Sequence, residues 1–242
     1  MKHHNFLFDL DQTLLDFHAT ERLALKIVVN GNGLSCTDDV IDHFSEYNKY
    51  LWLELEKGTI TRNELFTLRF NDLFSRCEGD SSGLDPLKVN SGFIYTMSCN
   101  GVEIDGALDF VRKLKSTIDD ARIYIASNGA TINAEGRVRT TGLSEYIDGM
   151  FISESMGLTK PAPEFFDKCL EYIGEPRETC IMIGDSLTSD MLGAKNSSIE
   201  SVWFMPQGDI ERAVKEYDIS YCASSFDELY EILLKWTSLR KV

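Results

Sequence analysis

From residue 101 onward, short apolar segments alternate with longer amphipathic ones, and this alternation constrains the fold more than any other feature of the sequence. The apolar segments are typical of buried strands, and the spacing between them is that of helices with one apolar face. The expected strands lie within ARIYIASNG, GMFIS, TCIMIGD and ESVWFM. Strands that alternate with helices form parallel sheets, so we predict an α/β fold with helices on both faces of the sheet.

Residues 17–100 show a different pattern, with amphipathic helical stretches and few strand signals. The sequence TRNE at residues 61–64 is a capping box, which marks the start of a helix. We therefore predict an all-helical domain over residues 17–100, inserted after the first strand. The α/β core is then discontinuous and consists of residues 1–16 and 101–242. A chain of 242 residues is long enough for a core domain that carries a smaller insert.

The net charge of −15 bears on the partners of the protein. A surface this acidic repels nucleic acid polymers and anionic membranes, so we expect neither as a partner. The six cysteines are scattered without a C-x-x-C pair, so neither a disulfide framework nor a zinc site is expected, and Cys180 is interpreted as a small core residue. No apolar run reaches about 18 residues and the start lacks a secretion signal, so a cytoplasmic location is expected.

Two carboxylates, Asp9 and Asp11, end the apolar segment NFLF near the start of the chain. Like charges this close repel each other, and burying either of them unpaired is costly. An isolated D-x-D is usually a strand end with a turn cap. An EF-hand calcium loop does not fit, because its sixth and twelfth positions would be Leu14 and Thr20.

Other polar residues follow the predicted strands in the same way. Ser127 and Asn128 end one strand, Asp185 ends another with Asp190 five residues later, and Lys160 precedes a proline that can open a helix. The carboxyl ends of parallel strands meet at one edge of a sheet, where such folds bind ligands. The joint occurrence of these residues at that edge therefore favours a binding site.

Their chemistry indicates phosphoryl transfer. Asp9, Asp11 and Asp185 offer the oxygen ligands that Mg²⁺ prefers, and a metal would offset their repulsion. Lys160 and the Ser127 hydroxyl can hold phosphoryl oxygens. Asp9 can then attack phosphorus to form an aspartyl-phosphate, while Asp11 protonates the leaving alcohol and later activates water.

The segments DLDQT, SNG, TKP and GDSLTSD resemble, in this order, the four motifs of the haloacid dehalogenase superfamily. The resemblance implies a Rossmann-like sheet with the helical insert as a cap. It implies that Asp9 is the nucleophile, that Asp11 is the general acid and base, and that Mg²⁺ binds the Asp9 and Asp185 side chains and the Asp11 backbone carbonyl.

The same resemblance assigns phosphate binding to Ser127, Asn128 and Lys160. It gives Asp190 a supporting role, orienting Lys160 or metal-bound water. Members that cleave carbon–halogen bonds lack an acid two residues after the nucleophile, so Asp11 favours a phosphatase.

The segment YNKYLWLELEKGTITRNELFTLRF resembles the cap of the pyrimidine 5′-nucleotidase branch, which hydrolyses nucleoside monophosphates. This resemblance implies a small phosphorylated substrate of that class. Asn48, Trp52 and Arg69 are then candidates to contact it, through an amide, an aromatic ring and a cation.

Three alternatives stay open at this point. One is a sugar-phosphate phosphatase or phosphomutase with the same core. The others are not enzymes: a phospho-acceptor signalling module, and a binding protein that keeps the fold. Receiver modules are about half this length and lack a large helical insert. The sequence leaves the oligomeric state and regulation open.

Overall fold

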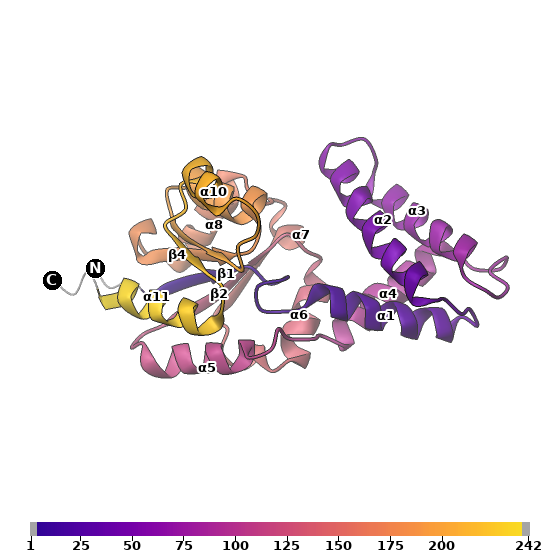
Figure 1. The fold of residues 1–242 in the computed structure, drawn as a ribbon, viewed down its shortest axis with the longest axis horizontal. Helices are drawn as coiled ribbons and strands as arrows, with labels where there is room; N and C mark the ends of the chain where they lie inside the picture. Colours follow the sequence, from indigo (N-terminus) through magenta and orange to yellow (C-terminus); the bar gives the residue numbers. More distant parts are fainter. Residues whose placement is uncertain (1–3, 239–242) are drawn as a thin grey trace. The chain divides into compact units, whose positions relative to one another are not determined.

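The computed structural model of the protein describes residues 4–238 and consists of two compact units (Figure 1). The first unit combines Met1–Asp16 with Val102–Val242 and contains all the strands. The second, Phe17–Gly101, is helical and is called the helical insert below. Among the helices within residues 4–238, none is both long and apolar enough to span a bilayer.

The first unit is built on a six-stranded parallel sheet of order β3-β2-β1-β4-β5-β6. Its strands are β1 (Asn5–Phe8), β2 (Arg122–Ser127), β3 (Gly149–Ile152), β4 (Cys180–Gly184), β5 (Glu200–Phe204) and β6 (Tyr221–Ala223). The chain order runs from β1 outward to β2 and β3, then returns to β4 on the other side of β1. This reversal makes the carboxyl ends of β1, β2 and β4 a topological switch point, where ligands bind in open α/β sheets.

Side chains of β1 alternate between the two faces of the sheet, as the period of a strand requires. Phe6 and Phe8 join the larger core cluster, while Leu7 joins a second cluster on the opposite face. Helices cover both faces, as the alternating sequence predicts (Figure 1). They are α5 (Ala107–Thr117), α6 (Thr131–Thr140), α7 (Ser153–Met156), α8 (Pro163–Ile173), α9 (Leu192–Asn196), α10 (Ile210–Tyr217) and α11 (Phe226–Ser238).

The structure differs from the sequence prediction at a few elements. The short edge strand β6 is not apparent in the sequence, because three residues are too few to show a period. Helix α8 begins at Pro163 and not at the proline after Lys160, so Lys160 precedes the helix by a short turn. Proline at the first helical position is the favoured arrangement in either case.

Four helices form the insert: α1 (Phe17–Gly31), α2 (Asp38–Glu56), α3 (Arg62–Arg76) and α4 (Pro86–Cys99). The predicted capping box opens α3, since Thr61 accepts from the Glu64 amide at 3.3 Å and Glu64 accepts from the Thr61 amide at 2.7 Å. Helix α4 lacks a clear sequence signal, because Gly92 and several small polar residues dilute its apolar face.

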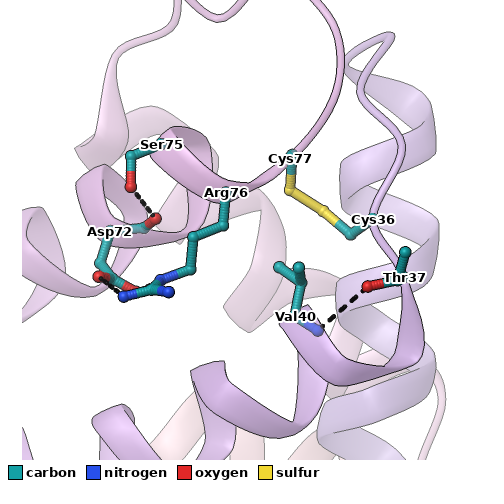
Figure 2. Close-up of a disulfide and its surroundings, with 7 residues drawn as sticks. All are labelled: Cys36, Thr37, Val40, Asp72, Ser75, Arg76 and Cys77. Atoms are coloured by element: carbon teal, nitrogen blue, oxygen red, sulfur yellow. Dashed lines mark hydrogen bonds and ion pairs between the residues drawn. A yellow bond between two sulfur atoms is a disulfide. The ribbon is translucent and has the colours of Figure 1, made fainter.

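A disulfide between Cys36 and Cys77 lies in the insert, although the scattered cysteines predict no disulfide framework (Figure 2). Their Cα atoms are 4.8 Å apart, and the flanking residues Ser35 and Glu78 exchange two backbone hydrogen bonds of 2.9 and 2.8 Å. The pairing was missed because 41 residues separate the two cysteines and only helix packing brings them together. Cys180 is buried, as predicted for a core residue.

Candidate active site

Asp9 lies at the carboxyl edge of the sheet, one residue after β1. Its backbone amide donates to the Ile183 carbonyl at 2.8 Å, so the pairing of β1 with β4 continues to Asp9 and fixes its position. The residue is only 7% exposed. A buried carboxylate needs partners, and the strand end therefore has to supply them.

Lys160 is the direct partner of Asp9, although 151 residues separate them in the sequence. Its ammonium donates three bonds of 2.6 Å, to an oxygen of Asp9, to an oxygen of Asp190 and to the Ala126 carbonyl. An ammonium has three hydrogens, so each of them has an acceptor. The side chain is 1% exposed and is held in one position.

The Asn128 side chain makes two hydrogen bonds to the backbone of Lys160. Its side-chain oxygen accepts from the Lys160 amide and its side-chain nitrogen donates to the Lys160 carbonyl, both at 2.8 Å. The Asn128 amide therefore positions the lysine, a role that the sequence did not indicate. Ser127, the last residue of β2, is 2% exposed and lies beside this contact in the chain.

Asp185 and Asp190 come from the segment after β4. Asp185 follows the strand directly, and Asp190 belongs to the π-helical turn Leu187–Met191. Carboxylate oxygens of Asp9, Asp185 and Asp190 all lie within 4.8 Å of one another. One Asp190 oxygen accepts from Lys160 and the other accepts from the Ser186 amide at 3.1 Å, so both are engaged.

Gly184 makes room for Asp190 against the end of β4. A Cβ atom at this position would lie 2.2 Å from an oxygen of Asp190, well inside van der Waals contact. The glycine is therefore required by the close approach of a side chain to the strand, and not by an unusual backbone angle.

The electrostatics of the cluster are dominated by negative charge. Burial raises the pKa of Asp9 well above its usual range; Lys160 opposes this rise, while Asp190, Asp11 and Asp185 add to it. Burial, reinforced by Asp190, raises the pKa of Asp185 to about 6. Burial alone would lower the pKa of Lys160, but Asp190 and Asp9 reverse this and raise it, so the ammonium stays charged at neutral pH.

The Asp11 carboxylate does not belong to the cluster of Asp9, Asp185 and Asp190. Both of its oxygens accept from the guanidinium of Arg137, a residue of α6 that is 1% exposed. Sequence reasoning did not single out Arg137. The available signal was a charged residue on the apolar face of a helix, between the buried residues Ala134 and Val138.

Asn48 and Arg69, two of the candidate substrate contacts, are buried inside the helical insert at 3% exposure each. Arg69 donates to Asn48 at 2.9 Å and also to Asn90, and Asn48 donates to Glu21 at 2.8 Å. Burial lowers the pKa of Arg69 to about 10. Burial also raises the pKa of Glu21, although its partners Ser45, Arg69 and Asn48 act to lower it. The structure thus joins one residue from each of the four helices in a buried polar network.

Trp52, the third candidate, lies one helical turn after Asn48 on α2 and is partly exposed. The guanidinium of Arg62 lies over its ring at 5.8 Å from the centroid, within the range of a cation–π contact. The structure therefore does not bring Trp52 into the network that contains Asn48 and Arg69.

The sequence profile described as haloacid dehalogenase-like hydrolase matches residues 4–197. The chain belongs to this family. The match covers β1, the whole helical insert and the segment that carries Asp185 and Asp190.

Individual relatives of this haloacid dehalogenase-like hydrolase cover most of its length. The HAD-hydrolase YfnB of Bacillus subtilis is 31% identical over 96% of both chains. Its crystal structure, bound to magnesium, matches with a TM-score of 0.82 over 96% of this chain and 99% of that one. Pyrimidine 5′-nucleotidase PynA of Streptococcus pneumoniae is 35% identical over 83% of both chains. Pyrimidine 5′-nucleotidase YjjG of Escherichia coli is 29% identical over 97% of this chain and 100% of its own.

These matches confirm three predictions made from the sequence. They concern the superfamily, the Rossmann-like α/β fold with a helical insert, and an enzyme of the phosphatase type. The cluster of three carboxylates around Asp9 is also suited to a metal ion.

Proposed function

We propose that this hydrolase cleaves phosphate monoesters and that its substrates are pyrimidine nucleoside monophosphates. The observation that carries the proposal is the 2.6 Å contact between Asp9 and Lys160, because a carboxylate that can attack phosphorus then lies beside an ammonium that can bind phosphate. The names of PynA and YjjG support the nucleotide part, and the resemblance of residues 47–70 to the cap of that branch supports it further.

The chemistry proceeds in two steps on the residues of this chain. An oxygen of Asp9 attacks phosphorus, the ester bond breaks, and the leaving alkoxide takes a proton from Asp11, which gives an aspartyl-phosphate on Asp9. Asp11 then takes a proton from water as that water attacks phosphorus, which releases inorganic phosphate and restores the Asp9 carboxylate. The Ser127 hydroxyl and Lys160, whose hydrogen bond to Asp9 is then exchanged for one to phosphate, hold the phosphoryl oxygens in both steps.

The oxygen-rich set of ligands fits Mg²⁺, which takes carboxylates, carbonyls and water. The Asp9 and Asp185 side chains and the Asp11 backbone carbonyl would hold it. Asp190 stays in a supporting role, because both of its oxygens already accept hydrogen bonds. When bound, the ion neutralises the excess negative charge of the cluster and of the substrate phosphate.

Phosphate release tests this function directly. We expect turnover of dUMP, dTMP or UMP with Mg²⁺, loss of it with a chelator, and loss of it in Asp9→Asn. Asp167→Asn, an exposed position on α8, is the matched control and should keep full activity. Activity that survives Asp9→Asn would overturn the mechanism.

The substrate class is tested in the same assay. A preference for sugar phosphates would keep the catalytic assignment and refute the nucleotide one. Formation of an isomer in place of inorganic phosphate would identify a phosphomutase. Negligible release from all esters would favour a binding or phospho-acceptor role.

A further inference from the structure

The contact between Arg137 and Asp11 joins segments 126 residues apart in the sequence. Nη1 and Nη2 of the guanidinium donate to separate oxygens of the carboxylate, the second bond at 3.2 Å. Planar, two-bond pairing is the geometry that fixes a carboxylate in orientation as well as in position. A lysine at this position would supply a point charge without that constraint.

The backbone of Arg137 is itself held firmly at the end of α6. Its carbonyl accepts from the Thr141 hydroxyl at 2.9 Å, from the Thr140 hydroxyl at 3.2 Å and from the Thr141 amide at 3.2 Å. Ala134, three residues before Arg137, and Val138, the next residue, are packed in the main core cluster. The guanidinium thus extends from a rigid base.

The same helix follows the strand that ends at the proposed phosphate-binding edge of the sheet. Helix α6 begins four residues after Ser127, so one strand–turn–helix segment supplies both the candidate phosphate-binding hydroxyl and Arg137. On its other side, the Asp11 carboxylate remains 33% exposed, compared with 1% for the side chain of Arg137. The buried guanidinium therefore contacts a carboxylate that stays partly accessible to solvent.

We propose that Arg137 is a positioning residue for Asp11: it holds the side chain whose protonated form gives its proton to the leaving group and whose carboxylate form then takes one from water. The inference rests on the proposed function, in which Asp11 protonates the departing alkoxide. Asp11 belongs to a turn in which the next residue, Gln12, has a positive φ of 59°, and the ion pair with Arg137 fixes the side chain that this turn presents. Proton transfer requires such fixed placement within hydrogen-bond reach.

The test uses two phosphate esters that differ in how much they need a proton donor. The alkoxide that leaves dUMP is strongly basic and needs a proton, whereas the p-nitrophenolate that leaves p-nitrophenyl phosphate does not. The ratio kcat/KM reports only the steps up to ester cleavage, so its value does not depend on the later hydrolysis of the aspartyl-phosphate. Arg137→Gln and Arg137→Lys are compared with the wild type on both esters with Mg²⁺ present.

A positioned general acid contributes roughly 100- to 10,000-fold, so we expect Arg137→Gln to lower kcat/KM about 10- to 100-fold on dUMP. On p-nitrophenyl phosphate the loss should be less than about threefold, and Arg137→Lys should restore part of the dUMP activity. Arg139→Gln, two residues along the same helix and exposed, is the control and should match the wild type on both esters.

Equal losses on the two esters, or a gain in activity, would overturn the positioning role. If Arg137→Gln does not fold, Arg137→Lys keeps the charge, and the ratio of its losses on the two esters decides the question. A wild-type protein that hydrolyses neither ester would instead refute the proposed function, so the two failures are distinguishable.

Discussion

The Lys160 ammonium lies 2.6 Å from an oxygen of Asp190, a residue with no exposed surface. The same ammonium contacts Asp9, so one cation is shared between a carboxylate that can act on substrate and one that cannot reach solvent. Removing one partner of a buried ion pair leaves an uncompensated charge and costs about 3–5 kcal/mol. Lys160 therefore stabilises the fold, in addition to the phosphate-binding role proposed for it.

Replacing this lysine should destabilise the metal-free protein strongly. We expect Lys160→Met to lower the free energy of unfolding by about 3–5 kcal/mol in urea with a chelator present. Mg²⁺ should restore more stability to the variant than it adds to the wild type, because the variant has more unbalanced negative charge. Lys168→Met, an exposed position on α8, serves as the control. A variant as stable as the wild type would refute a structural role for the pair.

The pKa of Asp185, raised to about 6 mainly by burial, predicts a pH dependence of stability. An unfolded aspartate titrates near pH 4, so the folded protein binds this proton more tightly. The stabilising contribution is therefore complete below about pH 4 and is lost as the pH rises through about 6. We expect urea unfolding with a chelator to show this decline in the wild type and a flatter profile in Asp185→Asn. Identical profiles would contradict the assignment.

The close approach of Asp190 to Gly184 predicts that adding a single methyl group here severely lowers activity and stability. In Gly184→Ala the new Cβ would lie 2.2 Å from an Asp190 oxygen, so Asp190 must move and its contact with Lys160 is disturbed. We expect loss of phosphatase activity and a lower melting temperature. Gly92→Ala, in an open position on α4, should instead raise stability by up to about 1 kcal/mol. Full activity in Gly184→Ala would show that Asp190 is not needed in its observed place.

The sequence was most informative where short-range patterns carry the structure. Asp9, Ser127 and Asp185 each end an apolar run, and a parallel sheet brings the ends of its strands to one edge whatever the intervening loops do. Their positions at the carboxyl edge follow from this local rule. The partnership of Lys160 with Asp190 was foreseen only as one of two options for Asp190, because sequence spacing does not define side-chain geometry.

The remaining features depend on packing between distant segments. Arg137 meets Asp11 because α6 packs beside the turn after β1, and a lone arginine on a helix does not reveal this. Asn48 and Arg69 are candidate substrate contacts by sequence, yet they are buried inside the insert, where Arg69 donates to Asn48 and to Asn90 and Asn48 donates to Glu21. No period or motif in the sequence distinguishes a buried network from a binding surface.

The disulfide between Cys36 and Cys77 gives a prediction about the helical insert. Closing a loop of about 40 residues contributes between about 3 and 5 kcal/mol in the chain-entropy view. Under oxidising conditions, Cys36→Ser should lower the melting temperature, and a reductant should lower that of the wild type but not that of the variant. Cys99→Ser, at an exposed free cysteine, is the control. Finding six reactive thiols in oxidised, unfolded wild-type protein would show that the bond does not form.

Trp52 gives the sharpest test of substrate selection by the insert. Its ring is partly exposed and has Arg62 over one face, whereas Asn48 and Arg69 are engaged inside the insert. Stacking of an aromatic side chain on a base contributes about 1–3 kcal/mol. Trp52→Ala should therefore raise KM for dUMP roughly 5- to 100-fold while leaving the hydrolysis of glycerol phosphate, an ester without a ring, unchanged, and Trp52→Phe should retain most of the preference. Equal losses on both esters would mean that the ring stabilises the insert and does not contact the base.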